Sequence, residues 1–249
     1  MPVPPDHACY NLRTDPASYT KPTGSVDCAT AHYFETVHVG AFAGAEADRS
    51  SPPPLGTPAR RSAYEECAGS AATFLGGDWR TAQLWLAVAV PSSNQWSGGA
   101  RWFRCDLLEI NDPPTPRTAS LQGALTGSST LALGCFKVVT KNDTIDSMTP
   151  IDCATPHEAE FAGIFDAPDA PYPADETARE KLRSSGCRGV VLAFAHIPAG
   201  GSLPGGVGWI FMDFDKPDWE RGDRGAGCYI MRFGGTFSRS VKGVGLAGL

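Results

Sequence analysis

The sequence has few charges and no long apolar run. Charged residues make up 19% of its 249 residues, and 21 lysines and arginines against 27 acidic residues give a formal net charge of −6. The largest basic cluster is Arg60-Arg61, so the chain lacks the basic face that nucleic acids and anionic lipids require. Its longest apolar stretch, Leu84 to Pro91, is too short to cross a bilayer. We therefore predict no nucleic-acid partner and no membrane span in this sequence.

The common catalytic and metal-binding motifs are also absent. There is no phosphate loop, no G-x-G-x-x-G after a strand and no C-x2-C or C-x4-C pair. Ser202 is not a nucleophile elbow because Pro204 occupies the last glycine position. His157-Glu158 does not begin an H-E-x-x-H motif because Phe161 stands at the second histidine position. We predict no metal, no cofactor and no enzymatic activity.

A secretory signal is missing at the amino terminus as well. The segment Met1-Pro-Val-Pro-Pro has neither a basic start nor an apolar run. Eight cysteines nevertheless favour an oxidising compartment, because cytosolic proteins rarely keep structural disulfides. We therefore expect an extracytoplasmic protein, secreted or membrane-anchored, whose only membrane attachment is an N-terminal anchor or signal that has been removed.

A cysteine-anchored octet occurs twice, which predicts a tandem duplication. Cys28 to Glu35 and Cys153 to Glu160 agree at five of eight positions, 125 residues apart. A second motif, Trp96-x4-Arg101-x3-Cys105, returns as Trp219-x4-Arg224-x3-Cys228, and Trp85 is matched with Trp209. We predict two domains, residues 1–127 and 128–249, each of ordinary domain size.

The eight cysteines divide four and four, and each has a counterpart in the other copy. That symmetry predicts four disulfides rather than free thiols or metal ligands. Four cysteines per copy allow three pairings, which spacing leaves open. Our working prediction is a set of four bonds: Cys9–Cys67, Cys28–Cys105, Cys135–Cys187 and Cys153–Cys228.

The local patterns predict an α+β fold in each copy, with one helix packed on a mostly antiparallel sheet and disulfides stapling the unit. In the first copy we expect one helix, Arg60 to Leu75, with Cys67 on its buried side and Gly76-Gly77 at its end. The expected strands are Cys9–Leu12, Tyr33–Phe42, Gln83–Val90, Arg101–Ile110 and a short edge strand at Leu121–Leu125. The second copy repeats the order with strands at Cys135–Thr140, His157–Phe165, Trp209–Phe214 and Ala226–Phe233, and a helix near Asp175–Ser185.

Each octet gathers a cysteine, an imidazole and a carboxylate, which invites three interpretations. His32 and Glu35, or His157 and Glu160, could supply two zinc ligands, but they share a face only on a helix, and a strand places them on opposite faces. A histidine-activated cysteine needs a free thiol, which the cysteine symmetry argues against. The structural interpretation has the histidine bonded to backbone and the carboxylate paired with Arg101 or Arg224. We favour that structural role.

The Trp/Arg/Cys motif predicts a turn followed by the strand that carries the last cysteine. An arginine five residues after a tryptophan can fold back over the indole, as Arg101 on Trp96 and Arg224 on Trp219. The alternative is an exposed aromatic patch on which Trp96 or Trp219 binds a glycan or peptide.

Together these motifs resemble the septum formation family of actinobacterial cell-envelope proteins. The resemblance is carried in each copy by Val/Ile-Asp-Cys-x3-His-x2-Glu, a helix with one cysteine, Trp-x4-Arg-x3-Cys and a final Ser-Leu/Val-x-Gly. It implies an extracytoplasmic domain, commonly preceded by a membrane anchor, that acts near the division septum, and it brings no catalytic residues. It marks ten positions as a family signature: Cys28, His32, Glu35, Arg101, Cys105, Cys153, His157, Glu160, Arg224 and Cys228.

The function expected on these grounds is a non-enzymatic binding or scaffold module of the cell envelope. Its partner would be an envelope protein or peptidoglycan. Two alternatives stay open at this point: a metal-dependent envelope hydrolase that uses the His/Glu pairs, and a glycan-binding module.

Overall fold

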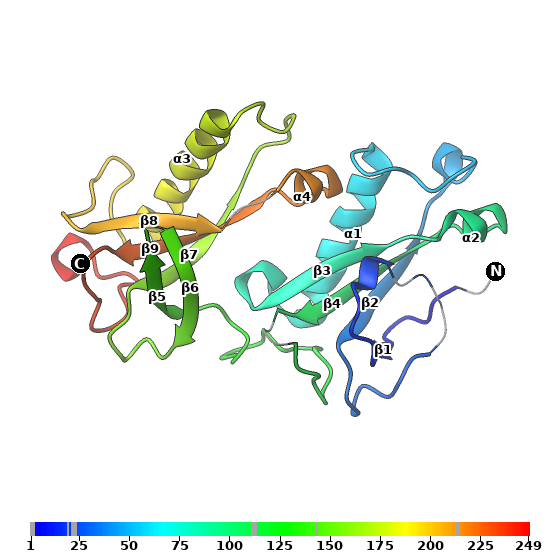
Figure 1. The fold of residues 1–249 in the computed structure, drawn as a ribbon, viewed down its shortest axis with the longest axis horizontal. Coiled ribbons are helices and arrows are strands. Elements are labelled where there is room, and N and C mark those ends of the chain that lie inside the picture. The colour runs from blue at the N-terminus through cyan, green and yellow to red at the C-terminus, as the bar shows by residue number, and fades with distance from the viewer. Residues whose placement is uncertain (1–2, 19, 21–23, 111–113, 143, 213–214) are drawn as a thin grey trace. The chain divides into compact units, whose positions relative to one another are not determined.

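The computed structural model describes the chain except residues 1–2, 19, 21–23, 111–113, 143 and 213–214. The chain forms two compact units: unit 1 contains Met1–Ala132 together with Pro217–Asp223, and unit 2 contains Leu133–Lys216 and Arg224–Leu249. Each unit has one antiparallel sheet and one long helix (Figure 1). The predicted α+β fold class is therefore confirmed.

The sheet of unit 1 has four described strands in the order β1-β2-β4-β3. These strands are β1 (Cys9–Tyr10), β2 (Phe34–Ala41), β3 (Leu84–Ala89) and β4 (Trp102–Glu109). Helix α1 (Pro58–Leu75) packs on one face of β2, β3 and β4. The core beneath it contains Cys67, Leu86 and Leu107, all nearly inaccessible to solvent.

The limits of α1 follow from its terminal residues. Thr57 caps the first turn by accepting a hydrogen bond from the Arg60 amide, and Pro58 supplies the preset dihedral angle that suits a first helical position. Gly76 ends the helix with φ of +76°, a left-handed conformation that favours glycine. The predicted helix, its end at Gly76 and the buried position of Cys67 are confirmed.

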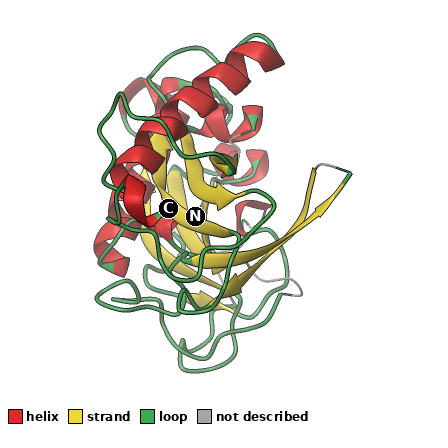
Figure 2. Cartoon of the chain, turned by 90° about the vertical axis from the view of Figure 1, so that its left-hand side faces the viewer, coloured by secondary structure: helices red, strands yellow, loops and turns green. Residues whose placement is uncertain are grey.

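The sheet of unit 2 has five described strands in the order β6-β5-β7-β9-β8. They are β5 (Cys135–Lys141), β6 (Thr144–Ile151), β7 (Ala159–Asp166), β8 (Val207–Met212) and β9 (Gly225–Arg232). Only Cys135 and Phe136 of β5 pair with β7, so the rest of the β5–β6 hairpin extends beyond that strand (Figure 2). Helix α3 (Glu176–Phe194) packs on β7, β8 and β9.

Helix α3 runs nine residues past its predicted end at Ser185. Gly186 lies in this additional part of the helix and packs closely on the sheet: a Cβ there would stand 2.4 Å from the ring of Phe165. The glycine therefore serves helix–sheet packing, which outweighs its poor helix propensity.

Several local predictions were wrong or incomplete. Leu121–Leu125 forms turns rather than an edge strand, although Leu121 is fully buried. Strand β6 and the short helices α2 (Ser93–Ser97) and α4 (Lys216–Arg221) were missed. Most of β6 is exposed, so its residues do not alternate between apolar and polar, and the strand also contains Pro150. The alternation by which a half-buried strand is predicted from sequence is therefore absent.

The two sheets share the same irregularities in their pairing. Cys9 pairs with Glu35 as Cys135 pairs with Glu160. The register of β2 on β4 shifts between Thr36 and His38, and that of β7 on β9 shifts between Phe161 and Gly163, the same positions 125 residues on. A β-bulge is a specific feature of one strand pair. Its recurrence at the same position shows a closer likeness between the two sheets than their strand order alone does.

The matching of Trp85 with Trp209 was wrong. Trp85 pairs with Leu108, three residues after Cys105, whereas Trp209 pairs with Ile230, two residues after Cys228. A shift of one residue turns a strand side chain to the other face, so the two tryptophans occupy different positions in their sheets.

Among the described residues, no helix has the length and apolar character needed to cross a membrane.

Candidate functional site

All eight cysteines form disulfides, but not in the predicted pairing. The bonds are Cys9–Cys28, Cys67–Cys105, Cys135–Cys153 and Cys187–Cys228. The predictions Cys9–Cys67, Cys28–Cys105, Cys135–Cys187 and Cys153–Cys228 were wrong: they joined each helix cysteine to the first strand, whereas the structure joins it to the strand that bears the last cysteine. In each unit one bond ties the long helix to the central strand that bears the last cysteine. The other ties the first strand to the loop that opens the octet.

The first octet forms a buried brace around the carboxylate of Glu35. Its two oxygens accept hydrogen bonds from the Ser120 hydroxyl and the Leu121 amide, both at 2.7 Å. His32 and Arg117 exchange backbone hydrogen bonds, so the same loop is held at a second point. The carboxylate therefore fastens the Ser-Leu-x-Gly segment to the start of β2.

The second octet builds the same brace. Glu160 accepts hydrogen bonds from the Ser240 hydroxyl and, at 2.8 Å, from the Val241 amide. His157 exchanges backbone hydrogen bonds with Phe237. The predicted pairing of these carboxylates with Arg101 and Arg224 was wrong, since a hydroxyl and an amide of the chain's own loop occupy the carboxylate oxygens.

The two histidines are fully buried and hold their own turns. Nδ1 of His32 lies 2.8 Å from the Thr30 carbonyl oxygen, and Nδ1 of His157 lies 2.7 Å from that of Thr155. A carbonyl oxygen only accepts, so Nδ1 carries the hydrogen and Nε2 of a neutral ring is the bare nitrogen. Neither Nε2 has a hydrogen-bond partner among the described residues. In unit 2 this nitrogen lies 4.0 Å from Glu160 Oε2.

The histidine and the glutamate therefore lie on the same side, contrary to the strand-based prediction. Strand β2 begins only at Phe34, so His32 precedes it and its direction does not follow the strand alternation. Ligand-capable atoms of Cys9, His32 and Glu35 lie within 4.8 Å of one another, as do those of Cys135, Cys153 and Glu160. The sulfurs belong to disulfides and offer no thiolate, so the arrangement fits a brace better than a metal site.

The two arginines of the Trp/Arg motif have different polar partners among the contacts that the structure describes. The Arg101 guanidinium carbon lies 4.3 Å from the ring centre of Trp96, as predicted, and Arg101 donates to the carbonyl oxygens of Ala47, Trp96 and Ala100. Arg224 forms an ion pair with Asp169 at 2.5 Å. Trp96 and Trp219 are only 1% and 4% exposed, which removes the glycan patch proposed for them.

Sequence reasoning missed a polar cluster on the face of β4 opposite α1. Arg104 and Asp106 are both fully buried and form a salt bridge at 2.9 Å, and the Thr36 hydroxyl donates to Asp106 at 2.7 Å. Burial raises the pKa of Asp106, while Arg104 and the Thr36 hydroxyl oppose the shift. An arginine and an aspartate two apart on a strand share a face, and that spacing is visible in the sequence.

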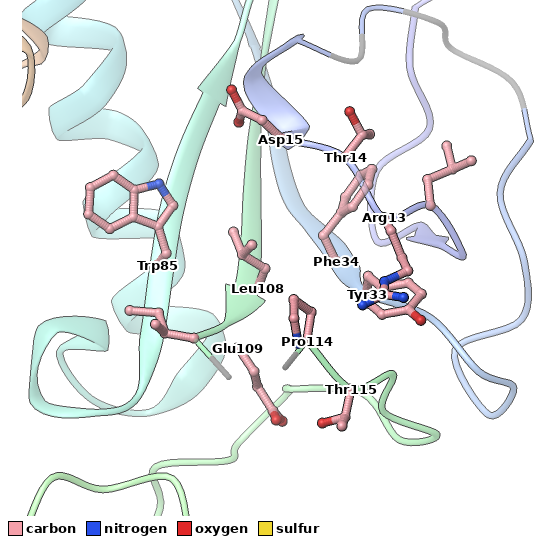
Figure 3. A pocket seen from close by; sticks show the side chains of 12 residues that line it. Arg13, Thr14, Asp15, Tyr33, Phe34, Trp85, Leu108, Glu109, Pro114 and Thr115 are labelled. Carbon is pink, nitrogen blue, oxygen red and sulfur yellow. The ribbon is translucent and has the colours of Figure 1, made fainter. Parts of the chain in front are cut away.

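A pocket of about 780 Å³ opens on this same face of unit 1. In Figure 3, Trp85 stands on one side, Tyr33 on the other, and Phe34 and Leu108 lie between them. Polar side chains complete the lining, with Arg13, Thr14, Asp15, Glu109 and Thr115 among them. The octet contributes Tyr33 and Phe34, two of the three positions at which the two octets differ. Glu158 and Ala159 replace these aromatics in the second octet.

The comparison with known families decides the family. A family model described as Septum formation matches residues 7–228. The chain belongs to the septum formation family. No curated protein and no solved structure matches it.

Proposed function

We propose that this septum formation protein is a non-enzymatic binding or scaffold module of the cell envelope, acting outside the cytoplasm in a process connected with cell division. The family supports the link to septum formation. The four disulfides support an oxidising compartment, because such bonds are rare in cytosolic proteins.

One observation carries the non-enzymatic part of the proposal: the signature side chains already bond to the chain itself. Glu35 and Glu160 each hold a serine hydroxyl and a backbone amide, and the histidines hold backbone carbonyls. A general acid or base must reach a substrate proton, and these groups are buried under their own loops. Such bonding supports a structural role for the signature.

We also propose that the two halves, 1–127 and 128–249, arose by duplication of one domain. The support is the recurrence of the Cys–Glu strand pairs, the β-bulges, the disulfide pattern and the carboxylate-held loops. A pair of matched positions that contact each other in both units adds to this support. In unit 1 these positions hold Gly40 and Glu66, and in unit 2 they hold Phe165 and Gly186, so the glycine stands on the strand in one unit and on the helix in the other.

The proposed function is tested by affinity capture on the oxidised chain. The immobilised chain should retain an envelope protein or peptidoglycan from an envelope extract of the source cells, and a reduced, alkylated sample should not. Metal analysis of chain purified without chelator is the second arm. Stoichiometric zinc that disappears in both His32→Ala and His157→Ala would overturn the proposal in favour of the metal-dependent hydrolase.

A further inference from the structure

We propose that the Cys9–Cys28 disulfide of unit 1 exchanges with an external dithiol: a thiolate of the dithiol attacks the Cys28 sulfur, and the Cys9 sulfur leaves beside the bare Nε2 of His32. The substrate of this site is a reduced dithiol, carried by a protein or by a small molecule. The inference adds a redox partner to the function proposed above and does not depend on which envelope component the chain binds.

The disulfides differ in their exposure to solvent. Six of the eight cysteines are buried, whereas Cys28 in unit 1 and Cys153 in unit 2 are half-buried. Both ends of the Cys67–Cys105 bond are inaccessible to solvent. Thiol–disulfide exchange requires access to the sulfur that is attacked. An external thiolate therefore reaches the Cys28 sulfur before it reaches the disulfide under the helix of unit 1.

The buried end of the Cys9–Cys28 bond lies beside two titratable side chains. The Cys9 sulfur, a ring nitrogen of His32 and a carboxylate oxygen of Glu35 lie within 4.8 Å of one another. Because His32 Nδ1 is taken by the Thr30 carbonyl oxygen, Nε2 is the acceptor that has no hydrogen-bond partner among the described residues. A disulfide sulfur has no hydrogen, whereas a thiol is a weak donor. Reduction of Cys9 therefore supplies the donor that this buried nitrogen lacks.

The neighbouring carboxylate favours a protonated product. A Cys9 thiolate within 4.8 Å of Glu35 is destabilised by the like charge, so the released sulfur takes up a proton and shares it with His32. The same ring nitrogen lies toward the carboxylate in unit 2, where Nε2 of His157 is 4.0 Å from Glu160 Oε2.

The exchange takes place in two balanced steps. A thiolate of the dithiol forms a bond to the Cys28 sulfur, the Cys9–Cys28 bond breaks, and its electron pair leaves on the Cys9 sulfur, which takes up the proton that the first thiol lost. The second thiolate of the dithiol then attacks its own sulfur in the mixed disulfide and releases Cys28, which takes up the second proton. The chain gains two electrons and two protons, and the dithiol is oxidised to a disulfide.

Opening this bond changes the constraint on the pocket of unit 1. The Cys9–Cys28 bond closes a loop that carries Leu12, Arg13, Thr14 and Asp15, all of which line the pocket. A disulfide restricts the chain that it closes. Reduction therefore loosens one wall of the pocket and leaves the helix–strand disulfide in place.

Two thiol probes test the inference on the intact, folded, oxidised chain. Glutathione, a monothiol, stops the exchange after its first step, and alkylation of the freed thiol with iodoacetamide prevents the bond from re-forming. Mass spectrometry should then find glutathione on Cys28 and the alkyl group on Cys9. Dithiothreitol completes the exchange, and it should open Cys9–Cys28 at least about tenfold faster than Cys67–Cys105.

The variant His32→Asn isolates the bare nitrogen. The asparagine amide still offers a donor to the Thr30 carbonyl oxygen, so only Nε2 is lost. At fixed ratios of reduced to oxidised dithiothreitol, His32→Asn should lower the equilibrium constant for reduction of Cys9–Cys28 about fivefold. A merely structural histidine predicts the opposite direction, because a loosened loop is easier to open. The matched control is His157→Asn, the same change in unit 2, which should leave the equilibrium of Cys9–Cys28 unchanged.

The inference is overturned by a Cys9–Cys28 bond that neither probe opens, by attachment of glutathione to Cys9 instead of Cys28, or by equal rates for Cys9–Cys28 and Cys67–Cys105. It is also overturned by a folded His32→Asn chain whose equilibrium constant is unchanged or raised. The measurements on the unmodified chain decide the inference even where the variant does not fold. A chain that fails these tests and still retains its envelope component in affinity capture keeps the function proposed above.

Discussion

Unit 1 and unit 2 have the same helix-covered face and different opposite faces. On the helix side both units carry the helix–strand disulfide, the bulge and the carboxylate-held loop. On the other face unit 1 has the buried Arg104–Asp106 pair, whereas unit 2 has an aromatic cluster of Phe136, Phe161 and Tyr229. Each unit has a pocket of its own, with different linings: about 780 Å³ in unit 1 and about 1010 Å³ in unit 2. The repeated residues therefore define a frame, and the residues that differ are where the two units can specialise.

The largest expected effect breaks the polar cluster of unit 1. Asp106→Ala leaves Arg104 as a buried charge without its carboxylate and should lower the free energy of unfolding of unit 1 by about 3 to 5 kcal/mol. Tyr229 stands at the matching position of unit 2, where Tyr229→Phe removes only a hydroxyl and should cost less than about 1 kcal/mol. Urea unfolding followed by tryptophan fluorescence reports mainly on unit 1, which contains Trp79, Trp85, Trp96, Trp102 and Trp219.

The control for this prediction replaces both charges. Arg104→Met with Asp106→Leu removes the pair without leaving either charge alone, and should fall within about 1.5 kcal/mol of the unmodified chain. A double variant as unstable as Asp106→Ala would show that the cluster stabilises through contacts other than its ion pair.

Next in size is the loss of a disulfide. Removing Cys67–Cys105 by double alanine substitution should destabilise unit 1 by about 4 kcal/mol, and removing Cys9–Cys28 by about 3 kcal/mol, because the closed loops span 38 and 19 residues. The corresponding bonds of unit 2 close loops of 41 and 18 residues and should follow the same order. An inverted order in both units would contradict the loop-entropy argument.

The features of this architecture that depend on local sequence could be predicted, and those that depend on contacts between distant segments could not. Helix α1 was predicted from apolar periodicity and the glycines at its end, which are local signals. The disulfide pairing could not be predicted, because it depends on which segments meet in space, and spacing left three choices. The partners of Glu35 lie 85 and 86 residues away, so the sequence marked the carboxylate without indicating what it holds.

The carboxylate brace provides the sharpest comparison between units. Glu35→Gln and Glu160→Gln keep the shape and remove the charge that strengthens two hydrogen bonds, so each should cost about 2 kcal/mol in its own unit. Equal effects are expected because the two networks are alike, and chemical unfolding with far-UV circular dichroism measures both. A cost confined to one unit would contradict the equivalence of the braces.

The smallest expected effect is the difference in stability between variants of the two arginines of the repeated motif. Arg101→Met loses three carbonyl contacts and the Trp96 contact, and should lower the free energy of unfolding by about 1 to 2 kcal/mol. Arg224→Met should cost about 0.5 kcal/mol, because Asp169, its ion-pair partner, has a side chain 86% exposed. Thermal unfolding of the two variants in parallel measures the difference, and equal shifts would mean that the motif acts alike in both units.

The central claim is that the repeated signature supports the fold and does not take part in binding. It is tested most directly by affinity capture from envelope extract with the double variant Glu35→Gln, Glu160→Gln, at a temperature where circular dichroism shows it folded. The account predicts that this variant retains the same envelope components as the unmodified chain. Loss of those components from a fully folded double variant would contradict it and make the paired carboxylates part of the functional site.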